Sequence, residues 1–123
     1  EKMFNDFSYT SALDLAHLAS FALQNKTLLE IASTPSITIT DVSGKISHQL
    51  YNINQLLGKI PGIKGLKTGY TQEAGECLVG YFEKDGHGLI TVVMGSQDRF
   101  GETVELIKWV SENFLWQEVT PSI

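Results

Sequence analysis

The sequence has few of the residues that would place it in a specialised class of protein. One cysteine, Cys77, stands in 123 residues, so no internal disulfide can form. No apolar run approaches the roughly 18 residues of a membrane-spanning helix. Nine basic residues are scattered among 14 acidic ones, for a net charge of −5, which argues against nucleic acid as a partner. His17, His48 and His87 lack the spacing of a metal site, and we expect neither metal nor cofactor.

What is present fits one ordinary globular domain over residues 1–123. Hydrophobic residues make up 42% and charged residues 19% of the chain, which argues against disorder. The length suffices for a real core. The chain begins with Glu1-Lys2 and not with methionine, and no signal peptide is visible. We therefore expect a segment of a longer protein, itself soluble.

The periodicity of apolar residues predicts three helices and five strands. The helices are expected over Ser11–Gln24, Thr27–Ala32 and Gly101–Leu115, and the strands over Ser36–Thr40, Ile46–Tyr51, Ile63–Tyr70, Glu76–Lys84 and Leu89–Gly95. Ser8 or Thr10 is expected to cap the first helix. Gly44 supplies the positive φ of a turn between the first two strands, and Asp85 to Gly88 reads as a second tight turn.

This order of elements predicts an α+β domain. An antiparallel sheet of about five strands is expected, with two helices covering one face of it. The strand beginning at Leu89 is apolar throughout, which favours a central position with both faces buried. The last helix is expected to bury a stripe of side chains at helical spacing, formed by Val104, Ile107, Val110 and Phe114.

The motif that points to chemistry is Lys67-Thr68-Gly69, in the strand expected over Ile63–Tyr70. Such a K-T-G forms one wall of the active site in serine β-lactamases and penicillin-binding proteins. Those enzymes also need a nucleophile in S-x-x-K and an S-x-N motif. The chain holds no S-x-x-K, and its one S-x-N, Ser111-Glu112-Asn113, falls in the last expected helix. The sequence therefore resembles part of an active site without its nucleophile.

The flanking residues sharpen this likeness. Low-molecular-mass penicillin-binding proteins, the D-alanyl-D-alanine carboxypeptidases, carry N-x-N-x-L-L and then a K-T-G followed by an aromatic residue and T-x-x-A-G. Their last helix carries a tryptophan about ten residues after a loop arginine. The chain resembles this pattern at Asn52–Leu57, at Gly65–Gly75, and at Arg99 with Trp109. Tyr9–Ala16 resembles the start of a family helix. Together the ordered landmarks are far more specific than the tripeptide alone.

The resemblance implies a partial β-lactamase/transpeptidase-like fold and a set of roles. Lys67 would act on substrate charge beside the serine, and Thr68 would bind the terminal carboxylate of the peptide. Gly69 would let the substrate lie along the strand, while the Tyr70 backbone N–H would donate into the oxyanion hole. Arg99 would pair with the substrate carboxylate. The nucleophilic serine and its lysine would precede Tyr9, outside the chain.

Each of these residues also has an ordinary interpretation. Lys67 could be an exposed lysine on an edge strand, and Arg99 a solvated loop arginine. Asn52 and Asn54 are expected to tie loop backbone together. Cys77 is expected to be a small core residue, and both tryptophans, Trp109 and Trp116, to pack the last helix.

Two functions follow. The first is a fragment of a serine-type D-Ala-D-Ala carboxypeptidase that trims peptidoglycan stem peptides and reacts with β-lactam antibiotics. The parent would act outside the cytoplasm, anchored at the outer face of the membrane, and the isolated chain would be inactive. The second is a truncated non-catalytic homologue that binds peptides or a partner. A soluble β-lactamase fits less well, because Tyr70-Thr71 and Ala74-Gly75 follow the K-T-G. Self-association through apolar surface left uncovered in the isolated chain is also expected.

Overall fold

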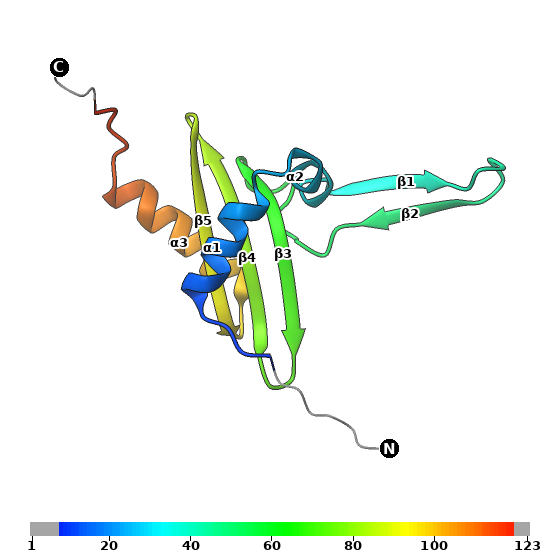
Figure 1. Cartoon of the computed structure of the whole chain (residues 1–123). Helices are drawn as coiled ribbons and strands as arrows, with labels where there is room; N and C mark the ends of the chain where they lie inside the picture. Colours follow the sequence, from blue (N-terminus) through cyan, green and yellow to red (C-terminus); the bar gives the residue numbers. More distant parts are fainter. Residues whose placement is uncertain (1–7, 120–123) are drawn as a thin grey trace.

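A computed structural model describes residues 8–119 of the chain. It contains three helices, two short strands that form a projecting hairpin, and three longer strands that form the main sheet (Figure 1). In chain order these are α1 (Ala12–Ala22), α2 (Lys26–Ala32), β1 (Ser36–Thr40), β2 (Ser47–Tyr51), β3 (Ile63–Thr71), β4 (Gly75–Lys84), β5 (His87–Ser96) and α3 (Arg99–Asn113). All eight expected elements are present, and each of their ends lies within two residues of the expected position.

Local residues set the start of α1 and the turn of the first hairpin. The expected caps of α1, Ser8 and Thr10, are wrong: Ser11 is the N-cap, and its hydroxyl accepts from the Asp14 backbone N–H at 3.1 Å. Ser11 lies one residue closer to the first apolar turn, which puts its oxygen within reach of the third helical N–H group. Gly44 has φ +73°, as the turn after Asp41 predicts.

The expected single sheet of five strands is in fact two sheets. β1 pairs with β2 alone, whereas β3, β4 and β5 form an antiparallel sheet with β4 in the middle. The two sheets separate because the segment from Asn52 to Gly62 folds as a loop and turns that insert Leu56 and Leu57 into the core. The hairpin is left projecting from the body (Figure 1).

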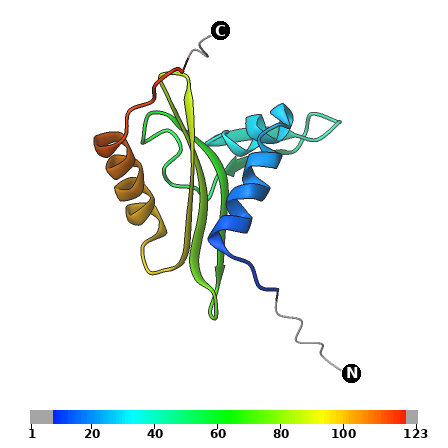
Figure 2. The same ribbon diagram turned by 60° about the vertical axis from the view of Figure 1, so that its left-hand side comes forward.

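The expectation that two helices cover one face is also wrong. α1 and α3 lie on opposite faces of the three-stranded sheet (Figure 2), and both contact β4 and β5. This arrangement explains why β5 is apolar on both sides although it is an edge strand and not a central one. A strand covered on both faces needs apolar residues at successive positions wherever it stands in the sheet.

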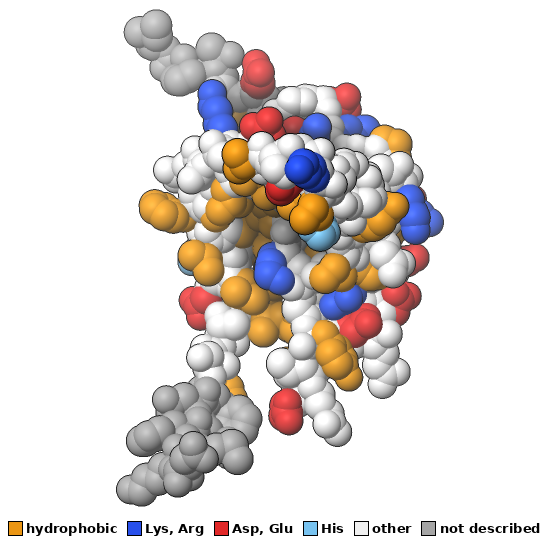
Figure 3. All heavy atoms as spheres, turned by 90° about the vertical axis from the view of Figure 1, so that its right-hand side faces the viewer, with side chains coloured by type: hydrophobic (Ala, Val, Ile, Leu, Met, Phe, Trp, Pro, Cys, Tyr) orange, Lys and Arg blue, Asp and Glu red, His pale blue; other side chains and the backbone are white. Residues whose placement is uncertain are grey.

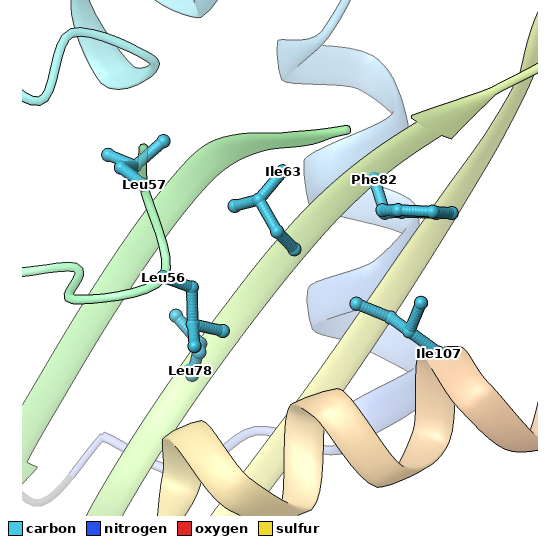
Figure 4. Packing of buried hydrophobic residues seen from close by; sticks show 6 residues of the cluster. All are labelled: Leu56, Leu57, Ile63, Leu78, Phe82 and Ile107. Carbon is cyan, nitrogen blue, oxygen red and sulfur yellow. The ribbon is translucent and has the colours of Figure 1, made fainter. Parts of the chain in front are cut away.

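The core lies between the sheet and α3. Its buried side chains come from the loop before β3, from β3, from β4 and from α3 (Figure 4): Leu56, Leu57, Ile63, Leu78, Phe82 and Ile107. Gly80 leaves room for Thr91 of β5 and for Thr103 of α3, because a Cβ there would lie 2.5 Å from Thr91 Oγ1 and 3.4 Å from Thr103 Cγ2. Thr103 is fully buried.

The expected buried stripe of α3 needs one correction. Ile107 is buried, and Val104 and Val110 are half-buried. Phe114, however, is 52% exposed, because the helix ends at Asn113 and Phe114 is the extended residue after it. Within residues 8–119, no helix is both long and apolar enough to cross a lipid bilayer.

Candidate active site

The K-T-G motif lies on β3, which is an edge strand. β3 pairs with β4 along one side only, so in the described part of the chain its other side carries backbone groups that no strand pairs. Side chains alternate along the strand. Lys67, opposite Val79, is exposed on the α1 face, and Thr68, opposite Leu78, lies on the α3 face. The Lys67 ammonium donates to the Thr68 carbonyl oxygen.

Gly69 leaves this edge open without being required by the packing of the chain. Its φ is not in the left-handed region. A Cβ built there would meet the Cβ of Cys77 at 3.8 Å, an ordinary contact. The next residue, Tyr70, is exposed. An extended peptide could therefore approach the backbone at Gly69 more closely than at a residue with a side chain.

Arg99 is brought to the K-T-G from 30 residues along the chain. It is the first residue of α3, and its Nη1 donates to the Gly69 carbonyl oxygen at 2.9 Å. Its guanidinium carbon lies 4.9 Å from the centroid of the Phe100 ring. Arg99 is half-buried, so it is not a solvated loop arginine. The structure thus gathers the candidate residues Lys67 to Tyr70 and Arg99 at one end of the sheet.

One residue beside this group was not singled out in the sequence. Glu76, at the start of β4, accepts from the Arg99 backbone N–H through Oε2 at 3.1 Å. Its signal in the sequence was its position, between the A-G that follows the K-T-G and the apolar part of β4. An acidic residue at a half-buried strand position needs a partner, and that partner could not be named before the fold was known.

The α1 side of the K-T-G strand is an apolar groove of about 570 Å³. It is lined by residues of α1, α2, β3 and β4, among them Leu15, Leu18, Leu28, Ile31, Leu66, Lys67 and Val79. The face that includes the β3 edge shows hydrophobic side chains gathered around a hollow, with single basic side chains among them (Figure 3). Lys67 is therefore the charged residue at the wall of an otherwise apolar groove.

The asparagines hold the loop that leads to the K-T-G strand, as expected. Asn52 Nδ2 donates to the carbonyl oxygens of Ala32 and Thr34, both at 3.2 Å, and its Oδ1 accepts from the Asn54 N–H at 2.9 Å. Asn54 Oδ1 in turn accepts from the Leu56 N–H at 3.1 Å. These bonds join α2, the base of the hairpin and the loop before β3.

The remaining candidates make none of these polar contacts, although Cys77 stands opposite Gly69 in the sheet. Cys77 is a half-buried free thiol on β4, in line with a small packing residue. His87 stacks on Trp116 with ring centroids 5.2 Å apart. Trp116 lies beyond α3, because the helix ends at Asn113. Trp109, on α3, is 54% exposed. Across residues 8–119, no three His, Cys, Asp or Glu side chains are grouped so as to hold a metal ion.

An edge strand carrying K-T-G, with helices on both faces of its antiparallel sheet, places the chain in the transpeptidase-like class shared by penicillin-binding proteins and serine β-lactamases. A model of the D-alanyl-D-alanine carboxypeptidase family matches residues 3–98. The chain belongs to this family, the S11 peptidases. The fold is that of known members: the Streptomyces K15 DD-transpeptidase superposes with a TM-score of 0.79 at 28% identity, over 88% of this chain and 44% of its own.

Other relatives agree. D-alanyl-D-alanine carboxypeptidase DacF of Bacillus subtilis is 30% identical over 92% of this chain and 29% of its own length. D-alanyl-D-alanine carboxypeptidase DacB2 of Mycobacterium tuberculosis is 31% identical over 69% of this chain and 28% of its own length. Penicillin-binding protein D2 of Listeria monocytogenes, solved with cefotaxime bound, is 35% identical over 74% of this chain and 36% of its own, with a TM-score of 0.62. The chain thus spans less than a third of the curated relatives and under half of the solved ones.

Proposed function

We propose that this chain is the C-terminal, K-T-G-bearing part of the catalytic domain of a serine-type D-Ala-D-Ala carboxypeptidase. In that domain it forms one wall of the site that trims the terminal D-alanine from peptidoglycan stem peptides, and that β-lactams acylate. The observation that carries the proposal is the unpaired edge of β3, which presents Lys67 and Gly69 beside Arg99, in a chain of the D-alanyl-D-alanine carboxypeptidase family.

The edge strand supplies binding and charge. A stem peptide in extended conformation adds to β3 as a further strand, with its backbone against Gly69. The ammonium of Lys67 and the hydroxyl of Thr68 attract the peptide's terminal carboxylate, and Arg99 pairs with that carboxylate through its planar guanidinium. The Tyr70 backbone N–H donates to the oxyanion that forms when the scissile carbonyl is attacked. Lys67 thereby contributes the catalytic side chain of this chain, and Tyr70 contributes its backbone N–H.

The rest of the chemistry comes from residues outside this chain. A serine activated by a lysine attacks the carbonyl of the penultimate D-alanine; the Oγ–C bond forms and the C–N bond breaks as the terminal D-alanine leaves. Water then hydrolyses the ester and restores the serine. Peptidoglycan lies outside the cytoplasmic membrane, so the complete protein acts there, anchored at the outer face.

The test is made in the full-length protein that contains this chain. Lys67→Ala should lower the rates of D-alanine release and of penicillin acylation by roughly 10²–10³, because one preorganised electrostatic contact is lost. The matched control is Lys64→Ala, which removes an equal charge from an exposed position on the same strand and should leave both rates unchanged. Unchanged acylation kinetics in the Lys67 variant would remove Lys67 from the site.

The isolated 123-residue chain gives a second test. It should neither release D-alanine nor be labelled by a fluorescent penicillin, because it holds no S-x-x-K and a serine needs a neighbouring base to become a nucleophile. A mass shift on one of its serines would contradict this. Non-covalent binding of a D-Ala-D-Ala peptide, in a reading frame without an upstream S-x-x-K, would instead support the truncated peptide-binding module.

The apolar groove between α1, α2 and β3 bears on partners as well. We propose that, in the isolated chain, this groove and the unpaired strand edges cause self-association, since exposed apolar grooves and open edges of this kind are usually covered in stable monomers.

A further inference from the structure

Glu76 lies at the junction of the three parts that make up the candidate site. On β4 it stands opposite Tyr70, the residue after the K-T-G, and opposite Ser96, the last residue of β5. β5 leads through two residues into α3, which begins with Arg99. A side chain at this position can therefore reach the K-T-G strand, the connecting loop and the start of α3.

The carboxylate of Glu76 accepts a hydrogen bond at the start of α3. The first N–H groups of a helix have no partner within the helix. Asp98 Oδ1 accepts from the Gly101 N–H at 2.9 Å, and Glu76 Oε2 accepts from the Arg99 N–H at 3.1 Å. A carboxylate at the positive end of the helix dipole is also favoured electrostatically. Glu76 thus fixes the first helical residue from the neighbouring strand.

That first residue is the arginine held against the K-T-G strand. The guanidinium of Arg99 reaches the Gly69 carbonyl oxygen at 2.9 Å. Its Nε is buried without a hydrogen-bond partner among the described residues. The side chain is therefore held by few polar contacts of its own, and its direction depends on where the backbone of Arg99 is placed.

We propose that Glu76 is a positioning residue: by binding the Arg99 backbone N–H it places the guanidinium beside Gly69, and so sets the preference of the site for peptides that end in a free carboxylate. This rests on the proposed function for the role of Arg99, but the contact between Glu76 and Arg99 does not. When Glu76 is removed, the N-terminus of α3 loses its external acceptor and Arg99 is no longer directed at the end of the K-T-G strand.

The experiment compares Glu76→Ala and Glu76→Gln with Glu73→Ala in the full-length protein. Glu73 is exposed in the turn between β3 and β4. Glu73→Ala therefore removes the same negative charge as Glu76→Ala but leaves the contact with Arg99 intact. For a peptide ending in D-Ala-D-Ala carboxylate, Glu76→Ala should raise KM roughly tenfold, the effect of losing one hydrogen bond to a charged group, with kcat little changed. For the same peptide ending in an amide, KM should stay unchanged. Glu76→Gln, which keeps an acceptor oxygen, should restore most of the loss.

Two further measurements decide whether Glu76 acts through Arg99. In an Arg99→Ala background, Glu76→Ala should add nothing to the rise in KM; an additive effect, or equal losses for both peptides, would overturn the positioning role. Amide hydrogen exchange at Arg99 should accelerate in Glu76→Ala but not in the Gln variant or in Glu73→Ala. The exchange measurement does not require an active enzyme. If the wild-type protein releases no D-alanine, the proposed function fails, and the exchange rate of the Arg99 amide alone tests the contact. An unchanged exchange rate in Glu76→Ala would then refute the contact between Glu76 and Arg99.

Discussion

At the scale of single residues, two glycines on neighbouring strands differ in what they serve. A methyl group at Gly69 meets nothing closer than 3.8 Å, whereas one at Gly80 would lie 2.5 Å from Thr91 Oγ1. We expect Gly80→Ala to lower the free energy of unfolding by roughly 1–3 kcal/mol through overpacking. Gly69→Ala should change it by less than about 0.5 kcal/mol. Denaturant unfolding of both variants measures the difference.

The same Gly69→Ala variant should nevertheless impair the site. In the full-length protein its Cβ would stand where the substrate backbone approaches β3, so kcat/KM for a D-Ala-D-Ala peptide should fall while stability is kept. A Gly69→Ala protein that unfolds early would show that the glycine serves packing instead. One that is both stable and fully active would remove Gly69 from the substrate path.

Residues with a short-range signal or a family landmark were predictable, and the tertiary contacts that join them were not. The K-T-G, the two loop asparagines and the turn glycine Gly44 follow from local patterns of residue type. The bond from Arg99 to Gly69 and the bond from Glu76 to Arg99 join positions 30 and 23 residues apart. Only the antiparallel register of β3, β4 and β5 brings these positions together, and local patterns in a single sequence do not reveal that register.

At the scale of elements, the projecting hairpin depends on its turn. The Asp41 carboxylate accepts from the N–H groups of Lys45 at 2.9 Å and Ile46 at 2.8 Å, and from the hydroxyl of Ser43. The Ser43 hydroxyl foremost, and then the Ile46 N–H, lower the pKa of Asp41 below its ordinary value of 3.8. These bonds supply the turn that two short, exposed strands need, because a hairpin without further strands is marginal in water.

The sign of the pH effect follows from that lowered pKa. A depressed pKa in the folded state means that the stabilisation is present in full well above pH 3.8 and declines as the pH falls below it. We expect the amide signals of Lys45 and Ile46 to shift towards random-coil values in NMR spectra as the pH falls below 3.8, the ordinary pKa of Asp41. Asp41→Asn keeps an acceptor without the charge and should remove the pH dependence, while Asp41→Ala should disorder the turn at every pH. Amide shifts that stay constant down to pH 2 would contradict this role.

The elements themselves were predictable, but their association was not. Alternation identified β1 and continuous apolar character identified β5. The same continuous character suggested a central strand, since burial on both faces is common in the middle of a sheet. Here α1 and α3 cover the two faces of an edge strand, and single-sequence periodicity cannot distinguish helix cover from strand neighbours.

At the scale of the whole molecule, the described structure leaves much apolar surface in contact with water. Leu18 is 61%, Phe21 72% and Ile31 70% exposed, and Leu18 and Ile31 line the groove beside Lys67. Such a surface on a chain of net charge −5 sets two effects against each other: burial of apolar area favours association, and like charge opposes it. Charge repulsion is screened within about 10 Å at 0.1 M salt, so burial should prevail.

We therefore expect the isolated 123-residue chain to associate with itself at micromolar concentration, by covering the groove, by pairing open edges of β3 or β5, or by exchanging α1 between copies. Light scattering across a concentration series should show a rising mass. Leu18→Glu places a charge in the groove and should shift the chain towards monomer if the groove is the contact. Val42→Glu, in the fully exposed turn of the hairpin, is the matched control and should not. Exchange of α1 would show instead as a slowly interconverting dimer. A compact monomer at high micromolar concentration, with no binding of an apolar dye, would mean that neither the groove nor the open edges recruit a second copy.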